Sequence, residues 1–319
     1  MSFSFENEKK NIIEILQKKD IPFTQCEIIA DIMATADLYG VTSHGVRILE
    51  SHINRFEKGA YNTTPDFKHI KETPSFALID GDNAFGFVSA HYCMNYTIEK
   101  AKEVGIFHVI SYNNNTLGPA FYYPLMAAKQ GMIGFVCCNS PAQMAPIGGK
   151  DKMLGTNPFA AVIPVPNQEP IIIDMATSVV AKSKFKEYKE QGKPLPKGWA
   201  LDKNGNETTD PDEAIQGLVQ PMAGFKGYAI AMLIDVLSGV LSGGAYLDKV
   251  GRFYSEDKNS MNVGFYFTAI NPKLIIGDEY DTVITDFVNR LRESTAINDS
   301  IISLPGDDRI SFMKNGMEK

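Results

Sequence analysis

The sequence predicts an α+β protein in which a mixed, largely antiparallel sheet packs against helices. The first 60 residues repeat apolar side chains at helical spacing, whereas Gly, Pro and Asn residues divide the stretch 133–174 into short apolar runs. Strands and helices do not alternate in the regular β-α-β order of a parallel sheet, which favours a mixed or antiparallel arrangement.

The N-terminal block is expected to form three packed helices. Apolar residues between Phe5 and Lys19 recur at helical spacing. Thr24 and Glu27 match a capping box, which would open a second helix that ends near Gly40. A third helix is expected to run from Ser43 to about Glu57.

Beyond residue 75 the sequence predicts short strands separated by helices. Strands are expected over 76–79, 107–111, 133–138, 159–164, 170–174 and 262–270. Helices are expected over 91–104, 121–129, 179–190, 226–241 and 280–293. The helix over 226–241 is the most apolar, so we expect it in the core, and 193–211 is expected to be a polar loop.

The composition excludes several classes of partner. The 319 residues carry a net charge of −7, which argues against nucleic acid or an acidic membrane surface. No apolar run approaches the roughly 20 residues that span a bilayer, and the polar start, Met1 to Lys10, is not expected to be a signal peptide. The lysine-rich stretch 182–193 is interrupted by acids and is expected to be a solvated helix face.

The four cysteines predict a reducing, cytoplasmic location. Cys26, Cys93, Cys137 and Cys138 are too few for a disulfide framework in a chain of this size. None has the C-x-x-C spacing of a structural zinc site, so no metal is expected. The pair Cys137–Cys138 lies in an apolar run and is expected to be two buried free thiols.

Common catalytic and nucleotide-binding motifs are absent from the sequence. The glycines never take the G-x-G-x-x-G spacing of a Rossmann dinucleotide site. Neither a phosphate-binding P-loop, a G-x-S-x-G nucleophile elbow nor an H-E-x-x-H zinc motif occurs. Phosphoryl transfer, α/β-hydrolase chemistry and zinc proteolysis are therefore not supported.

The segment Val41 to Arg47 combines a histidine with an arginine at the expected start of a helix. His44 titrates near neutral pH and can transfer a proton, and Arg47 can hold a carboxylate through two hydrogen bonds. A helix N-terminus also offers free N–H groups to an anion. For this segment taken alone, the simpler interpretation is that Ser43 caps the helix and His44 is a surface histidine.

Further polar or glycine-rich segments lie beside predicted strands and helices. They are Asn113–Ala120, Asn139–Pro141, Pro146–Lys150, Leu154–Pro158, Asp174–Thr177 and Gly224–Tyr228. Small residues let a ligand approach the backbone closely, the Asp174 carboxylate can bind a ribose hydroxyl, and Lys226 between two glycines suits a phosphate or a substrate anion. Helix capping and turn formation also explain each segment taken alone.

Taken together and in order, these motifs resemble the malate/L-lactate dehydrogenase-like family over nearly the whole chain. The matching motifs are Ser43-His44-Gly45, Leu154-Gly155-Thr156-Asn157-Pro158, Asp174-Met175-Ala176-Thr177, Gly198-Trp199-Ala200-Leu201-Asp202, Lys226-Gly227-Tyr228 and Leu304-Pro305-Gly306-Asp307.

The resemblance implies a non-Rossmann NAD(P)-binding fold, usually a homodimer, with a sheet domain and a helical domain. It implies that His44 transfers a proton and that Ser140 contacts the substrate. The cofactor contacts that it implies are Thr116, Leu117, Gly118, Pro119, Ala120, Asp174, Met175, Ala176, Lys226, Pro305, Gly306 and Asp307. We accordingly expect a helical region over 1–75 that carries His44, a central sheet domain over 76–275 that binds cofactor and substrate, and a C-terminal helical segment over 276–319 that packs back on the N-terminal region.

The implied reaction is hydride transfer between a small 2-hydroxy acid and its 2-oxo acid, with either NAD or NADP. Arg47 and Ser140 would hold the substrate carboxylate while His44 takes or gives the hydroxyl proton. Two positions depart from the family pattern: Thr116 stands where many members have a second histidine, and Ile48 where the arginine often lies. A cyclic imine carboxylate reductase, a ureidoglycolate-type dehydrogenase and a catalytically silent dinucleotide-binding protein remain alternatives.

Overall fold

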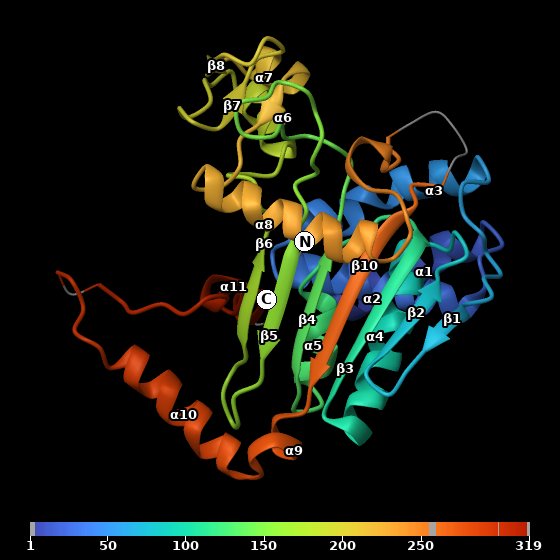
Figure 1. Ribbon diagram of the computed structural model, residues 1–319, viewed down its shortest axis with the longest axis vertical. Coiled ribbons are helices and arrows are strands. Elements are labelled where there is room, and N and C mark those ends of the chain that lie inside the picture. The colour runs from blue at the N-terminus through green and yellow to red at the C-terminus, as the bar shows by residue number, and fades with distance from the viewer. Residues whose placement is uncertain (1–3, 255–259, 299, 318–319) are drawn as a thin grey trace.

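A seven-stranded sheet forms the centre of the molecule (Figure 1). The structure is a computed structural model that describes residues 4–254, 260–298 and 300–317. The strands are, in spatial order, β1 (Lys68–Glu72), β2 (Phe76–Asp80), β3 (Ile106–Asn114), β10 (Val263–Ile270), β4 (Ile133–Cys138), β5 (Phe159–Ile163) and β6 (Ile171–Met175). Only β2 and β3 pair in parallel, and the other neighbours are antiparallel. The expected mixed, largely antiparallel sheet is confirmed.

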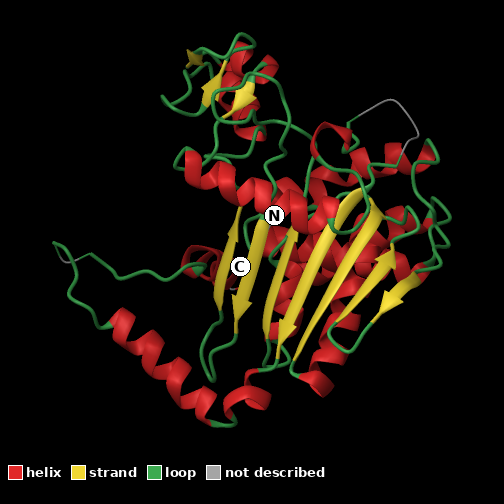
Figure 2. Cartoon of the chain, in the orientation of Figure 1, coloured by secondary structure: helices red, strands yellow, loops and turns green. Residues whose placement is uncertain are grey.

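Figure 2 shows that helices cover one face of this sheet, whereas a single helical segment crosses one end of the strands on the other face. The helices are α1 (Phe5–Gln17), α2 (Phe23–Leu38), α3 (Leu49–Glu57), α4 (Gly86–Val104), α5 (Tyr122–Ala128), α6 (Ser183–Glu190), α7 (Pro211–Gln216), α8 (Phe225–Asp235), α9 (Pro272–Ile276), α10 (Glu279–Arg292) and α11 (Asp307–Met317). α4 and α5 pack directly on the sheet with α2 behind them, and α8 crosses the opposite face. Among the described helices, none has the length and apolar character to cross a bilayer.

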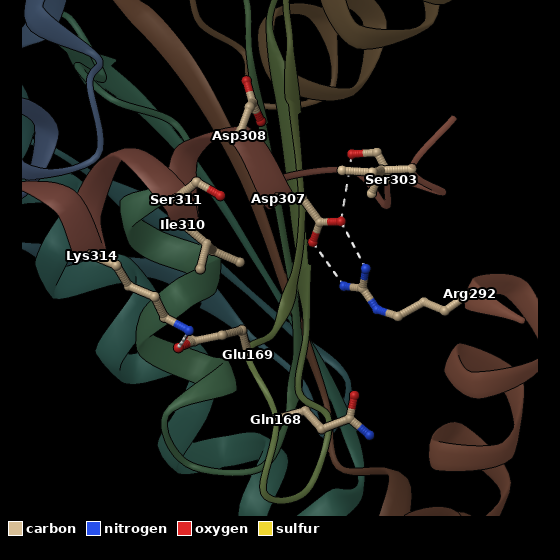
Figure 3. Close-up of a pocket in the computed structure, with 10 residues that line it drawn as sticks. Gln168, Glu169, Arg292, Ser303, Asp307, Asp308, Ile310, Ser311 and Lys314 are labelled. Atoms are coloured by element: carbon tan, nitrogen blue, oxygen red, sulfur yellow. Dashed lines mark hydrogen bonds and ion pairs between the residues drawn. The ribbon is translucent and has the colours of Figure 1, made fainter. Parts of the chain in front are cut away.

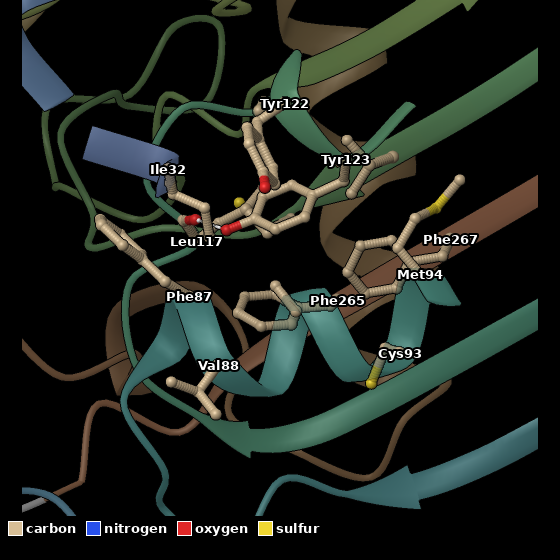
Figure 4. Close-up of a cluster of buried hydrophobic side chains, with 14 of the residues drawn as sticks. Ile32, Phe87, Val88, Cys93, Met94, Leu117, Tyr122, Tyr123, Phe265 and Phe267 are labelled. Carbon is tan, nitrogen blue, oxygen red and sulfur yellow. Dashed lines mark hydrogen bonds between the residues drawn. The ribbon is translucent and has the colours of Figure 1, made fainter. Parts of the chain in front are cut away.

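The main core fills the layer between the sheet and helices α2, α4 and α5. Figure 4 shows Phe265 and Phe267 of β10 facing Phe87 and Met94 of α4 and Tyr123 of α5. These side chains are buried because alternate residues of a strand point to one face, which here is the face covered by helices. All four cysteines are free and buried, which confirms the expectation for Cys137 and Cys138.

A small second unit interrupts the chain between β6 and α8. It contains α6, α7 and a three-stranded sheet of β8 (Glu207–Thr208), β7 (Ala200–Leu201) and β9 (Leu218–Val219) around its own apolar cluster. The loop expected over 193–211 therefore carries two short strands, which are too brief for apolar alternation to predict. The strand β1 was also missed, because its side chains are all exposed.

The C-terminal elements lie along one edge of the sheet. Ile284 and Val288 of α10 pack on Val165 and Ile171 at the β5–β6 end, and the rest of α10 extends away from the body (Figure 1). α11 returns to contact α2, where the ring of Phe312 lies against Gly40.

Three expectations about helices were wrong. α2 begins at Phe23 after Pro22, so Thr24 and Glu27 form no capping box. Residues 42–48 form two short 3₁₀ turns, and α3 begins only at Leu49. α8 is not a core helix in the single chain: it continues into a π-helical turn, Val236–Val240, and its outer side chains are exposed. Its apolar residues lie on all sides of the helix. A helix without a polar face is expected to be buried, which is why the sequence alone predicted a core position.

Candidate active site

The strand order brings the predicted motifs to one edge of the sheet. β3, β4 and β6 run in the same direction because one antiparallel strand separates each from the next. Their C-terminal ends therefore lie at the same edge. The segments that begin at Asn115, Asn139 and Ala176 follow these three ends, and Leu154–Pro158 leads into β5 beside them.

A cavity of about 530 Å³ opens at this edge. Its lining residues are Ser43, His44, Ile48, Thr116, Ser140, Pro141, Gln143, Thr156, Ala181, Lys182, Ser183, Arg252, Phe253 and Tyr254. Three sequence-predicted residues meet here from distant parts of the chain: His44, Thr116 and Ser140. Of the predicted cofactor segment 116–120, only Thr116 lines this cavity, and Leu117 and Ala120 are buried in the main core.

The half-buried His44 lies in a segment that Asp37 holds in place. The Asp37 carboxylate accepts a hydrogen bond from the backbone N–H of Val46 at 2.6 Å. Gly45 passes so close that a Cβ atom there would lie 2.1 Å from that carboxylate, which explains a glycine after the histidine. Ser43 does not cap a helix. Its hydroxyl is 2.9 Å from His44 Nδ1, so the pair can share a hydrogen bond.

Burial lowers the pKa of His44 below its ordinary value. The nearby Asp174 carboxylate acts to raise this pKa and the Arg309 guanidinium acts to lower it. Asp174 and Arg309 also pair with each other, so their effects on the imidazole oppose. Because burial favours the uncharged form, the His44 imidazole is mainly neutral at neutral pH.

Ser140 is positioned by the buried residue Asn157. The Asn157 side-chain oxygen accepts from the backbone N–H of Ser140 at 3.0 Å, and its amide nitrogen donates to the Ala231 carbonyl at 2.9 Å. Gly155 fits because a Cβ there would lie 2.1 Å from the Ser140 carbonyl oxygen. Within the described residues, the buried side-chain oxygen of Gln143, which also lines the cavity, has no hydrogen-bond partner. This oxygen is an unsatisfied acceptor close to the cavity.

A second cavity adjoins the first, and a third adjoins the second. The second, of about 510 Å³, shares Ser43, Ala181 and Ser183 with the first and contains Arg47 and Arg309. Arg47 thus faces this neighbouring cavity and not the one that contains Ser140. A third cavity, of about 570 Å³, shares Asp308 with the second.

The predicted residues Pro305, Gly306 and Asp307 lie beside the third cavity. Pro305 accepts a backbone hydrogen bond from Ile172 at 3.0 Å, and Gly306 packs against the same residue. Figure 3 shows Asp307 accepting two hydrogen bonds from Arg292, at 2.8 and 2.9 Å. Arg292 lowers the pKa of this carboxyl. Asp307 is therefore an anion that is already paired.

The predicted residues Asp174, Met175, Ala176 and Lys226 lie close together. The backbone of the following residue, Thr177, accepts a hydrogen bond from Met222 at 2.9 Å, which joins the end of β6 to the start of α8. Asp174 is largely buried and Met175 is 41% exposed. Lys226 is exposed at the first turn of α8, whose N-terminus has no side-chain cap.

Sequence reasoning missed Lys182 and Arg252 as cavity residues. Lys182 was expected on a solvated helix face, but it is half-buried just before α6 and lines the cavity. The sequence does not distinguish Lys182 from the other lysines of this stretch, because acidic residues are interspersed among all of them. Lys184 and Lys189 do pair with carboxylates at the surface. Arg252 belonged to no motif.

Comparison with known proteins identifies the family. Residues 3–319 match the family described as malate/L-lactate dehydrogenase. A malate dehydrogenase of Pyrococcus horikoshii is 39% identical over 292 residues, which cover 89% of this chain and 80% of the relative. An L-sulfolactate dehydrogenase of Methanocaldococcus jannaschii is 38% identical over 303 residues, covering 95% and 87%. The solved structure of sulfolactate dehydrogenase from that organism superimposes with a TM-score of 0.92 at 36% identity, covering 99% of this chain and 91% of the other. The chain belongs to the malate/L-lactate dehydrogenase family.

For a member of this family, the two departures from the usual pattern fall inside the cavity. Thr116 and Ile48 both line it. A threonine hydroxyl cannot exchange protons near neutral pH as an imidazole does, so Thr116 leaves His44 as the one imidazole among the described lining residues. With Ile48 in the cavity and Arg47 outside it, the guanidinium in the lining comes from Arg252.

Proposed function

We propose that this protein is an NAD(P)-dependent dehydrogenase that interconverts a small 2-hydroxy acid and its 2-oxo acid. The observation that carries the proposal is the imidazole of His44 in one cavity with the hydroxyls of Thr116 and Ser140. An imidazole that exchanges a proton, beside hydroxyls that orient a small acid, is what oxidation of an alcohol carbon requires of the protein. The names of the relatives, which are dehydrogenases of malate and sulfolactate, agree with it.

The residues along the three adjoining cavities fit a nicotinamide dinucleotide. Arg47 in the second cavity provides positive charge for a phosphate group, whereas Arg309 in the same cavity is paired with Asp174. The residues that would hold the dinucleotide are Thr116–Ala120, Asp174–Ala176, Lys226 and Pro305–Asp307, of which Thr116 and Asp307 line the cavities while Leu117 and Ala120 would support them from the core. When bound, the cofactor supplies the hydride acceptor or donor.

The chain's own residues position the substrate and manage one proton. In oxidation, neutral His44 accepts the proton of the substrate hydroxyl, and in reduction the protonated imidazole returns it. The Ser43 hydroxyl, 2.9 Å from His44 Nδ1, fixes the orientation of the ring. Ser140, held by Asn157, and Gln143 are placed to bind the polar groups of the acid.

The proposed function is tested with a panel of 2-oxo acids assayed with NADH and with NADPH. Pyruvate, oxaloacetate and 3-sulfopyruvate are offered beside a cyclic imine carboxylate, and absorbance of the reduced nicotinamide is followed. Turnover of a 2-oxo acid with either cofactor is expected. Quenching of NADH fluorescence without turnover of any 2-oxo acid would instead indicate a silent dinucleotide-binding protein.

The pH profile of oxidation should reflect the lowered pKa of His44. The base form is required, so kcat/KM for oxidation should fall as pH drops through a pKa below the usual histidine value of about 6.5. Reduction needs the protonated form and should become faster as pH decreases over the same range. If the same pH dependence of kcat/KM persisted in His44→Ala, the titrating group would be one other than His44.

We also propose that the chain forms a homodimer through the exposed apolar residues of α8 to α10. These side chains are Phe225, Met232, Leu233, Val236, Val240, Leu241, Leu274, Ile275, Ile276, Val283, Phe287 and Leu291. Apolar surface on this scale is typical of a contact with another protein surface. An apolar hollow of about 360 Å³ beside α8, lined by Met232, Val236 and Val240, would receive side chains of the second copy.

Leu233→Asp should convert the dimer to a monomer. Leu233 is 56% exposed in the single chain, so the change costs little there, but it would bury a carboxylate in the interface. Sedimentation equilibrium measures the mass. Ile70→Asp, at a site that is 52% exposed on the distant strand β1, is the matched control and should remain dimeric. A wild-type chain that is monomeric at all concentrations would contradict the proposal.

The four buried free thiols favour a reducing compartment, and we propose the cytoplasm.

A further inference from the structure

Three cations gather at the end of the cavity that is formed by the small unit and the 252–254 segment. Lys182 and Arg252 line the cavity. Lys152 lies beside Lys182, since their Nζ atoms donate to the carbonyls of the neighbouring residues Gln216 and Gly217, and Arg252 lies within electrostatic range of both. Among the residues that the structure describes, no carboxylate forms an ion pair with any of the three. Within the described part of the chain, the cavity therefore concentrates positive charge that has no carboxylate paired with it.

The backbone holds these cations in place. Lys152 Nζ donates to the Gln216 carbonyl at 2.9 Å, and Lys182 Nζ donates to the Gly217 carbonyl at 3.4 Å, both at the C-terminal end of α7. Arg55 of α3 donates to the carbonyl of Phe253 at 3.1 Å, which anchors the chain next to Arg252. Uncharged carbonyls thus hold the two lysines side by side, and a backbone contact next to Arg252 places the third cation beside them, so a bound anion would be the missing counter-charge.

Partial burial makes this arrangement costly without an anion. Burial lowers the pKa of Lys182 to about 8, and the neighbouring Lys152 contributes in the same direction. Burial also lowers the pKa of Lys152. An anion between Lys182 and Arg252 would oppose both effects.

The number of charges indicates which anion binds. When the carboxylate beside the reacting carbon lies near His44 and Ser140, a monocarboxylate such as lactate brings no charge to the three cations. A carboxylate or sulfonate at the other end of a short hydroxy acid brings one. Fully ionised acid groups of both kinds accept several hydrogen bonds from ammonium and guanidinium donors.

We propose that Lys182 and Arg252, supported by Lys152, bind a second acid group at the far end of the substrate, so that the enzyme selects dianionic 2-hydroxy acids. This inference rests on the proposed function, since it assumes that the 2-hydroxy acid occupies the same cavity. It assigns a specificity role to two residues that lie outside every motif of the sequence.

The test compares malate and 3-sulfolactate with 2-hydroxybutyrate, which has the length of malate but no distal charge. Wild type should have a higher kcat/KM for the dianions. In Lys182→Gln and in Arg252→Gln, the ratio of kcat/KM for malate to that for 2-hydroxybutyrate should fall roughly 10- to 100-fold, mainly through KM for malate, because each change removes a charged hydrogen bond. Lys189→Gln, which removes a surface lysine paired with Asp212, is the matched control and should keep the wild-type ratio.

Two results would overturn the inference. An unchanged ratio in both variants would mean that the cations bind the carboxylate common to all substrates. A raised KM for the dinucleotide with an unchanged ratio would mean that they bind a phosphate of the cofactor.

A binding measurement separates this inference from the proposed function. Succinate has no hydroxyl to oxidise, so its binding, followed by calorimetry against butyrate, does not require turnover. If no 2-hydroxy acid is oxidised yet succinate binds to wild type and binds at least about tenfold more weakly to Lys182→Gln, the anion site stands and the proposed function fails. If 2-hydroxy acids are oxidised but succinate binds no better than butyrate, the proposed function stands and the anion site fails.

Discussion

Replacement of His44 by alanine is expected to lower kcat in both directions by roughly 10²- to 10⁴-fold, the usual contribution of general acid–base catalysis. The reason is that His44 is the one imidazole in the described lining of the cavity, and Thr116 cannot take over its role. The dinucleotide should bind with nearly the same Kd, because none of the proposed cofactor contacts includes His44. Steady-state kinetics and titration of NADH fluorescence give the two quantities.

A second histidine variant controls for the loss of an imidazole as such. His69 is exposed on β1, outside the cavity, and its partners are Glu72 and Tyr92. His69→Ala should retain wild-type turnover. If His44→Ala also retained it, His44 would not be the proton-transferring group, although the family assignment would be unaffected.

The replacement of Asn139 by alanine is expected to destabilise the fold by about 2–4 kcal/mol. Asn139 is 1% exposed at the end of β4, directly before Ser140. Its amide nitrogen donates to Asp235 at 3.2 Å and to the Ala245 carbonyl at 2.7 Å, and its oxygen accepts from the Gly264 N–H at 2.9 Å. The substitution leaves three buried groups short of a partner, one of them a carboxyl.

The carboxyl of Asp235 accounts for much of the expected cost. It is 4% exposed and retains one hydrogen bond, from the Leu247 N–H at 3.1 Å. Burial raises its pKa, and the hydrogen bond from Asn139 acts to lower it. Urea unfolding followed by circular dichroism measures the change. Asn206→Ala, in an exposed turn, should cost less than about 0.5 kcal/mol, and a loss of under about 1 kcal/mol in Asn139→Ala would show that the network matters little to stability.

The sequence predicted those elements in which each face is either buried or exposed along its whole length. The strands β4 and β10 contain few polar side chains, because one face packs on the helical layer and α8 with its π-helical turn covers part of the other, and such apolar segments are visible in the sequence. α1 was also predicted, because one face contacts α2 and the other faces solvent.

Elements were mispredicted where long-range contacts override local preference. The turns at residues 42–48 replace a helix because Asp37 of α2 binds the Val46 N–H and packs on Gly45, and no local pattern reveals that contact. The exposure of α8 depends on which sheet face it crosses. Lys182 differs from its neighbouring lysines only because the C-terminal end of α7 and Lys152 lie beside it.

By itself the sequence determined the reaction family, since the identities and order of short motifs such as Ser43-His44-Gly45 and Leu154–Pro158 are local properties of the chain. Only the tertiary structure decided which of these residues share a cavity, that Arg47 faces a different one, and that Lys182 and Arg252 line the first. The physical reason is that the cavity forms where the ends of β3, β4 and β6 meet the small unit and the 252–254 segment. Those neighbours are set by strand order and packing between residues more than 100 positions apart, which no local pattern encodes.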